Sequence, residues 1–219
     1  MSSETKELAP KVATATQTGI LFVVSSPSGG GKGTLIQRVL SRLQNLSYSV
    51  SYTTRKPRNG EVHGREYFFV SREEFSRMVE KNDFLEWATV HSHLYGTSRS
   101  QVAHDVSLGR DIVLEVDVQG AASIRNLVHD AVSVFILPPS LEVLRKRLIA
   151  RGTDSDEELG VRLRNAPEEL KAYKTFDYVI INDDVEQAAA KLMAIIEAER
   201  LRLSHQEEKI RGVVDSFQL

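Results

Sequence analysis

The sequence has no cysteine, a single tryptophan and a formal net charge of only -2 at pH 7. The lack of cysteine excludes disulfide scaffolds, thiolate nucleophiles and thiolate metal sites, and it suits a reducing cytoplasm. Because the net charge is close to zero, no global basic field would attract nucleic acid or an anionic membrane. We therefore expect neither as a partner, and basic residues that bind an anion must be clustered locally.

Long apolar runs are also lacking. No stretch approaches the roughly 20 residues that a membrane-spanning helix needs. The first nineteen residues are mostly polar or small, and they lack the apolar segment of a secretory signal. We expect a cytoplasmic protein whose residues 1–19 form a disordered tail.

The 219 residues, of which 41% are hydrophobic and 26% charged, suit one α/β domain with small inserted lobes. Four short apolar runs are typical of strands buried on both faces of a parallel sheet. They cover residues 20–24, 112–116, 132–137 and 178–181. Amphipathic stretches lie between or after these runs, among them 141–150 and 185–203. The alternation predicts a mostly parallel central sheet between two helical layers, a three-layer α/β sandwich.

Two stretches depart from this alternation. Residues 51–97 hold a polar loop, a short helix opened by the capping box of Ser71 and Glu74, and a predicted antiparallel hairpin. We assign the lone Trp87 to the core of that hairpin. Residues 151–169 are charged and helical with few apolar anchors, so we expect a mobile insert there.

A glycine-rich loop follows the first predicted strand and ends in Lys32, after which a helical pattern begins. A strand, a glycine loop and a helix together cradle phosphate, because loop amides, the helix N-terminus and the lysine all favour an anion. The usual pattern is G-x-x-x-x-G-K-[ST], but here Ser26 comes first and Gly33 follows the lysine. Either Thr34 or a water then replaces the usual hydroxyl ligand of magnesium. The alternative is a glycine-rich turn with an incidental lysine.

A second cluster lies in residues 51–67. It brings together Ser51, Arg55, Arg58 and Tyr67. Two arginines and two hydroxyls can surround a second phosphate. The alternative is a solvated basic loop.

With these motifs the sequence closely resembles the guanylate kinase family over roughly residues 20–196. The motifs are the glycine loop, Ser51-x-Thr53-Thr54-Arg55-x-Pro57-Arg58-x-Gly60-Glu61, Phe84-Leu85-Glu86-Trp87-Ala88, Tyr95-Gly96-Thr97, Asp117-Val118-Gln119-Gly120 and Ile181-Asn182-Asp183-Asp184. The resemblance implies a P-loop kinase that transfers the γ-phosphoryl group of ATP to GMP, giving ADP and GDP in purine nucleotide metabolism. It also implies Mg²⁺ bound with ATP.

The resemblance further implies the roles of individual residues. ATP would be held by Ser26, Pro27, Ser28, Gly29, Gly30, Gly31, Lys32, Gly33, Thr34 and Asn182. The GMP phosphate would be held by Ser51, Arg55, Arg58, Tyr67 and Tyr95, and the guanine by Glu86, Thr97 and Asp117. Glu115 faces either the helix layer or the nucleotide. The catalytic residues would be Lys32 and the lid arginines Arg147, Arg151 and Arg162. Thr34 is a candidate metal ligand.

The same resemblance divides the chain into a kinase domain at 20–205 and a C-terminal tail at 206–219. Within the domain, the core covers 20–50, 98–145 and 170–205, the GMP-binding lobe 51–97 and the lid 146–169. The sequence does not fix the oligomeric state and argues neither for nor against a homo-oligomer.

The chemistry suits these residues, because phosphoryl transfer to an already charged phosphate oxygen needs positioning and electrostatic stabilisation rather than a general base. Mobile inserts can exclude water, the competing acceptor. Glu86 can accept from the N1–H of guanine, where adenine presents a lone pair instead. Without the resemblance, Glu86 reads as a solvent-facing strand residue.

Two other functions fit parts of this sequence. Guanylate-kinase-like domains of membrane scaffolds bind peptides without catalysis, but this chain keeps Lys32, the glycines and the lid arginines. Related kinases act on a ribose bisphosphate, but Glu86, Thr97 and Asp117 favour a guanine base.

Overall fold

The central feature of the computed structural model is a five-stranded parallel sheet. The structure describes residues 18–90, 92–151 and 156–217. The strand order is β2-β7-β1-β8-β9. The strands are β1 (Leu21–Ser25), β2 (Leu46–Tyr48), β7 (Asp111–Glu115), β8 (Val132–Leu137) and β9 (Tyr178–Ile181). Each pairs with its neighbours in parallel, which confirms the predicted sheet.

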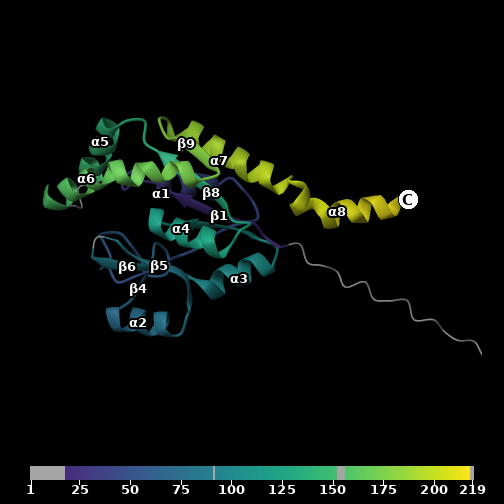
Figure 1. Cartoon of the computed structure of the whole chain (residues 1–219), viewed down its shortest axis with the longest axis horizontal. Coiled ribbons are helices and arrows are strands. Elements are labelled where there is room, and N and C mark those ends of the chain that lie inside the picture. The colour runs from purple at the N-terminus through teal and green to yellow at the C-terminus, as the bar shows by residue number, and fades with distance from the viewer. Residues whose placement is uncertain (1–17, 91, 152–155, 218–219) are drawn as a thin grey trace, which may run out of the picture.

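Helices cover both faces of this sheet (Figure 1). On one face, α1 (Lys32–Leu40) and α7 (Val185–Arg200) pack against alternate residues of β1 such as Phe22. On the other, α3 (Arg99–Ser107) and α4 (Val118–Leu127) pack against the residues between them, such as Val23. Burial of both faces explains why the strands are continuously apolar, and the three-layer α/β prediction is confirmed.

A smaller sheet forms the lobe inserted after β2. Its order is β4-β3-β6-β5, made of β3 (Tyr52–Thr53), β4 (Phe68–Phe69), β5 (Phe84–Val90) and β6 (His93–Ser98). β5 and β6 pair antiparallel as predicted. Helix α2 (Arg72–Glu80) packs below the sheet, and Ser71 caps it by accepting from the backbone N–H of Glu74. The prediction for Trp87 is wrong, because its side chain is 48% exposed on β5.

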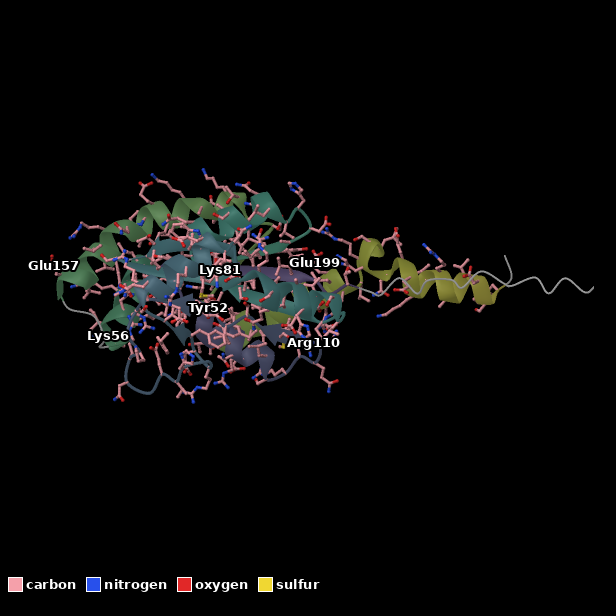
Figure 2. The ribbon with its side chains drawn as sticks, turned by 90° about the horizontal axis from the view of Figure 1, so that it is seen from below. Tyr52, Lys56, Lys81, Arg110, Glu157 and Glu199 are labelled. Atoms are coloured by element: carbon pink, nitrogen blue, oxygen red, sulfur yellow. The ribbon has the colours of Figure 1, made fainter. Side chains whose placement is uncertain are left out.

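A helical segment lies at one end of the molecule. It contains α5 (Leu141–Arg151), α6 (Asp156–Lys171) and the 3-10 helix η1 (Ala172–Thr175). Leu144, Leu148 and Ala166 form a small core between α5 and α6. Figure 2 shows Glu157 of α6 and Lys56 of the lobe at the end of the molecule opposite the C-terminal helix.

The chain continues beyond α7 as a further helix, α8 (Leu203–Ser216), which projects from the body (Figure 1). The stretch predicted as a tail from residue 206 onward therefore starts inside a helix. Its described side chains are mostly exposed. None of the helices in the described part of the chain combines the length and hydropathy needed to cross a membrane.

Candidate active site

The glycine loop between β1 and α1 is fixed by its own backbone and by two distant side chains. Gly29 and Gly31 have φ of 85° and 90°, a left-handed conformation that L side chains rarely adopt. The Gly30 carbonyl accepts hydrogen bonds from Asn182 Nδ2 at 3.0 Å and from Arg147 Nη1 at 3.3 Å. Segments that follow β8 and β9 therefore hold the loop open over the N-terminus of α1.

A cavity of about 530 Å³ lies between this loop, the inserted lobe and α6. Its walls include most of the predicted site residues: Ser26, Ser28, Lys32, Ser51, Arg55, Arg58, Tyr67, Glu86, Tyr95, Glu115, Asp117 and Arg162. Glu115 ends β7 and Asp117 follows it, so both lie at the carboxyl end of a parallel strand, where ligands collect in α/β sheets. One cavity thus joins the phosphate-cradling lysine to the second basic cluster.

The basic cluster is ordered by an acidic residue. Glu61 accepts two hydrogen bonds from the Arg55 guanidinium, both at 2.9 Å, and a third from the Arg58 backbone N–H at 2.7 Å. The Arg55 guanidinium also lies 5.4 Å from the ring centroid of Tyr67. Burial and the neighbouring carboxylates raise the pKa of Tyr67, so its phenol remains a hydrogen-bond donor. Planar bidentate pairing fixes the direction in which Arg55 presents its remaining donors.

The acidic end of the cavity is built on β5, β6 and α4. Glu86 is 8% exposed and its Oε1 accepts from the Thr97 hydroxyl at 2.5 Å. Burial raises the pKa of Glu86 to about 7; the Thr97 hydrogen bond opposes the increase, and the charge of Asp117 adds to it. Asp117 caps α4 by accepting from the backbone N–H of Gly120. Thr97 is fully buried behind Glu86, so it holds the carboxylate in place.

Glu115 lines the cavity rather than the helix layer, and a role toward the nucleotide stays a prediction. Its Oε1 lies 3.9 Å from Lys32 Nζ, and its Oε2 accepts from the Tyr48 hydroxyl at 3.1 Å. Burial, followed by the charge of Glu115, raises the pKa of Tyr48. A neutral phenol therefore anchors the carboxylate beside the lysine.

Helix α6, which contains most of the predicted lid, reaches the glycine loop through two side chains. Arg162 Nη1 donates to Ser28 Oγ at 2.9 Å, and the Ser28 backbone N–H donates to Glu169 Oε2 at 3.0 Å. A carboxylate thus occupies one amide of the loop that we expect to bind phosphate. The predicted Arg151 ends α5, and its side chain lies outside the described residues.

A second cavity of about 280 Å³ lies on the other side of the loop. Gly29, Gly31, Thr34, Arg147, Asn182 and Val185 line it. Thr34 therefore faces a different space from Lys32 and Glu115. Asn182 Oδ1 is buried here and has no hydrogen-bond partner among the described residues.

Most of the chain matches one known family. Residues 19–199 match the family model described as guanylate kinase.

The chain belongs to the guanylate kinase family.

Similar proteins include the guanylate kinases of Caldanaerobacter subterraneus subsp. tengcongensis and Polaromonas sp. The first is 47% identical over 87% of this chain and 92% of its own length, and the second 49% identical over 86% and 91%. The crystal structure of guanylate kinase from Anaplasma phagocytophilum matches with a TM-score of 0.73 and 34% identity. That match covers 87% of this chain and 90% of the solved one. The protein is thus a nucleoside monophosphate kinase that transfers a phosphoryl group from ATP to GMP.

Three polar residues at this guanylate kinase site were not predicted as site residues. Glu61 orders Arg55, Tyr48 anchors Glu115, and Glu169 contacts the glycine loop. Glu61 lies inside the basic motif, so its proximity to Arg55 was a usable signal. The other two contacts join residues 67 and 141 positions apart, and no local pattern marks them.

Proposed function

We propose that GMP occupies the larger cavity and that ATP lies along the glycine loop and the second cavity. The main support for this proposal is that Lys32, Arg55 and Glu86 line one continuous cavity. Ser51, Arg55, Arg58, Tyr67 and Tyr95 would surround the GMP phosphate, with Glu86 and Asp117 facing the guanine and Thr97 supporting Glu86. The unpartnered Asn182 Oδ1 would accept from the donor's adenine amino group.

Transfer then needs alignment of two anions. The bond between the γ-phosphorus and its bridging oxygen breaks, and ADP leaves with the electron pair. A GMP phosphate oxygen forms the new bond. Lys32, the loop amides and Arg162 would stabilise the charge on the transferred group, and Arg147 and Arg151 are proposed to complete the lid. Closure of α6 over the cavity would exclude water.

Magnesium would enter with ATP. Among the described residues, no three acidic or histidine side chains cluster as a metal cage. That fits Mg²⁺, which usually takes one or two carboxylates plus phosphates and waters. A Cβ atom on Gly33 would lie 3.3 Å from Glu115 Oε1, so position 33 faces this carboxylate. Glu115, directly or through water, is therefore a better candidate ligand than Thr34. The ion would neutralise charge between the phosphates.

This assignment is tested by metal binding. Glu115→Gln should weaken Mn²⁺ binding to the ATP complex, followed by paramagnetic resonance, whereas Thr34→Ala should leave it unchanged. Weaker binding in Thr34→Ala alone would assign the ligand to Thr34.

Base choice is proposed to depend on Glu86. Its carboxylate can accept from guanine N1–H and the amino group, and a site built on such bonds can discriminate by roughly 10⁴ to 10⁵. Glu86→Gln should lower the ratio of kcat/KM for GMP to that for AMP by at least about a hundredfold. An unchanged ratio would overturn the assignment.

We further place this activity in the cytoplasm, where ATP and GMP are both available, as a step in purine nucleotide recycling.

A further inference from the structure

Gly120, in the first turn of α4, lies against the carboxylate of Glu86. A Cβ atom on Gly120 would be 2.8 Å from Glu86 Oε2 and 3.2 Å from Asp117 Oδ1. Non-bonded heavy atoms are ordinarily separated by about 3.5 Å or more. Any side chain at position 120 would therefore displace the Glu86 carboxylate.

Glu86 has little freedom to move within its present site. Its other oxygen accepts from the fully buried Thr97 hydroxyl at 2.5 Å, and the two residues face each other across β5 and β6. The carboxylate is thus held between a hydroxyl on one side and the bare backbone of α4 on the other. A shift away from α4 would disturb the bond to Thr97.

The backbone of Gly120 gives no local reason for glycine. It lies in a helix and has none of the left-handed geometry of Gly29 or Gly31. In a helix interior, alanine is favoured over glycine by about 1 kcal/mol. The requirement for glycine comes from Glu86, a residue of another element.

We propose that Gly120 is a specificity-determining positioning residue, whose missing side chain lets the Glu86 carboxylate reach the place where it accepts from guanine. The inference rests on the proposed role of Glu86 in reading the base. It gives α4 a second part in selecting the acceptor, beside the proposed role of its N-cap Asp117, although Gly120 itself offers no side chain to the nucleotide.

The test is Gly120→Ala. The KM for GMP should rise roughly ten- to a hundredfold, because a misplaced carboxylate loses hydrogen bonds to the base. The preference for GMP over AMP should fall with it. The KM for ATP should stay unchanged, because the substitution does not alter the glycine loop.

Gly212→Ala is the matched control. Gly212 also lies in a helix, α8, and a Cβ atom there would meet nothing within 4 Å. This variant should keep the KM for GMP and the base preference. Thermal unfolding of both variants shows whether they fold.

Repeating the substitution in the Glu86→Asp variant distinguishes a positioning role of Gly120 from a general disturbance of the site. In Glu86→Asp the side chain is one methylene shorter, so Gly120→Ala should raise the KM for GMP less than it does in the wild type. Equal increases in both backgrounds would overturn the inference, as would an unchanged KM and base preference in Gly120→Ala. If Glu86→Gln loses base preference while Gly120→Ala keeps it, the inference alone fails. If both variants keep it, the assignment of Glu86 to guanine fails as well.

Discussion

The carboxyl group of Glu86 is buried, and its pKa is raised, at the place where we propose that a carboxylate accepts from guanine. Burial and Asp117 hold the pKa of Glu86 at about 7, although Thr97 lowers it. A protonated Glu86 can accept fewer hydrogen bonds from guanine than a carboxylate can. Binding of GMP should therefore favour the ionised form and release a proton.

The affinity for GMP should consequently depend on pH through Glu86. From about pH 8 to about pH 6 the wild type should lose up to about tenfold in GMP affinity, because the neutral form becomes dominant below its pKa. The measurement is a calorimetric titration across this range. Glu86→Gln is the control, since it keeps the titration of the GMP phosphate itself. Parallel pH profiles for the two proteins would contradict the prediction.

For individual residues, the sequence predicted which side chains line the cavity better than it predicted the burial of their neighbours. Local motifs marked Arg55, Glu86 and Asp117 because their neighbours along the chain form part of the pattern. The exposure of Trp87 was missed, although strand alternation explains it. Successive side chains of a strand point to opposite faces, so burial of Glu86 turns Trp87 outward.

Among the elements, α6 and the glycine loop are linked most directly at the proposed donor site. Glu169 accepts from the Ser28 backbone N–H, while Arg162 donates to the Ser28 hydroxyl. One contact places an anion, and the other a cation, beside the same loop residue. A donor phosphate approaching Ser28 would be repelled by Glu169 and attracted by Arg162.

Glu169→Gln should therefore lower the KM for ATP. Like charges about 4 Å apart repel by about 1 kcal/mol even in water, which corresponds to about a fivefold change. Steady-state kinetics at saturating GMP measure it. Glu142→Gln is the control, because Glu142 is exposed, pairs with Lys146 and lines neither of the two cavities. A higher KM for ATP in Glu169→Gln would show that the carboxylate supports donor binding instead.

The core elements were predictable because their apolar runs and helical spacing are local properties. β2 was missed because it has three residues, all half-buried, and its place at the sheet edge depends on pairing with β7. Helix α8 was missed for a different reason: none of its residues is buried, so its sequence gave a weak core signal.

For the molecule as a whole, one buried ion pair joins the sheet to α7. Asp111 at the start of β7 is 4% exposed; it accepts from the Ile20 backbone N–H at 2.8 Å and from Arg200 Nε at 2.7 Å. Arg200 ends α7 and also donates to the Gln44 carbonyl. Four parts of the chain far apart in sequence thus meet at the end of the sheet away from the site.

Asp111→Ala should lower the free energy of unfolding by about 3 kcal/mol, because it leaves the guanidinium and a backbone N–H without their partner. Urea denaturation measures the loss. Glu197→Ala removes an exposed partner of the same arginine and should cost less than about 1 kcal/mol. The KM for GMP should be unchanged in both. Equal losses of unfolding free energy in the two variants would show that the buried pair stabilises the fold no more than the exposed one.

The single tryptophan of the chain lies on the inserted lobe, half exposed and one residue from Glu86. Its fluorescence is therefore an optical signal from the inserted lobe, because neither the central sheet nor α6 contains a tryptophan. Excitation of this indole would report the rate at which the lobe responds to GMP in stopped flow, without an added label. The same emission would follow local opening of the lobe separately from unfolding of the parallel sheet, which circular dichroism would record.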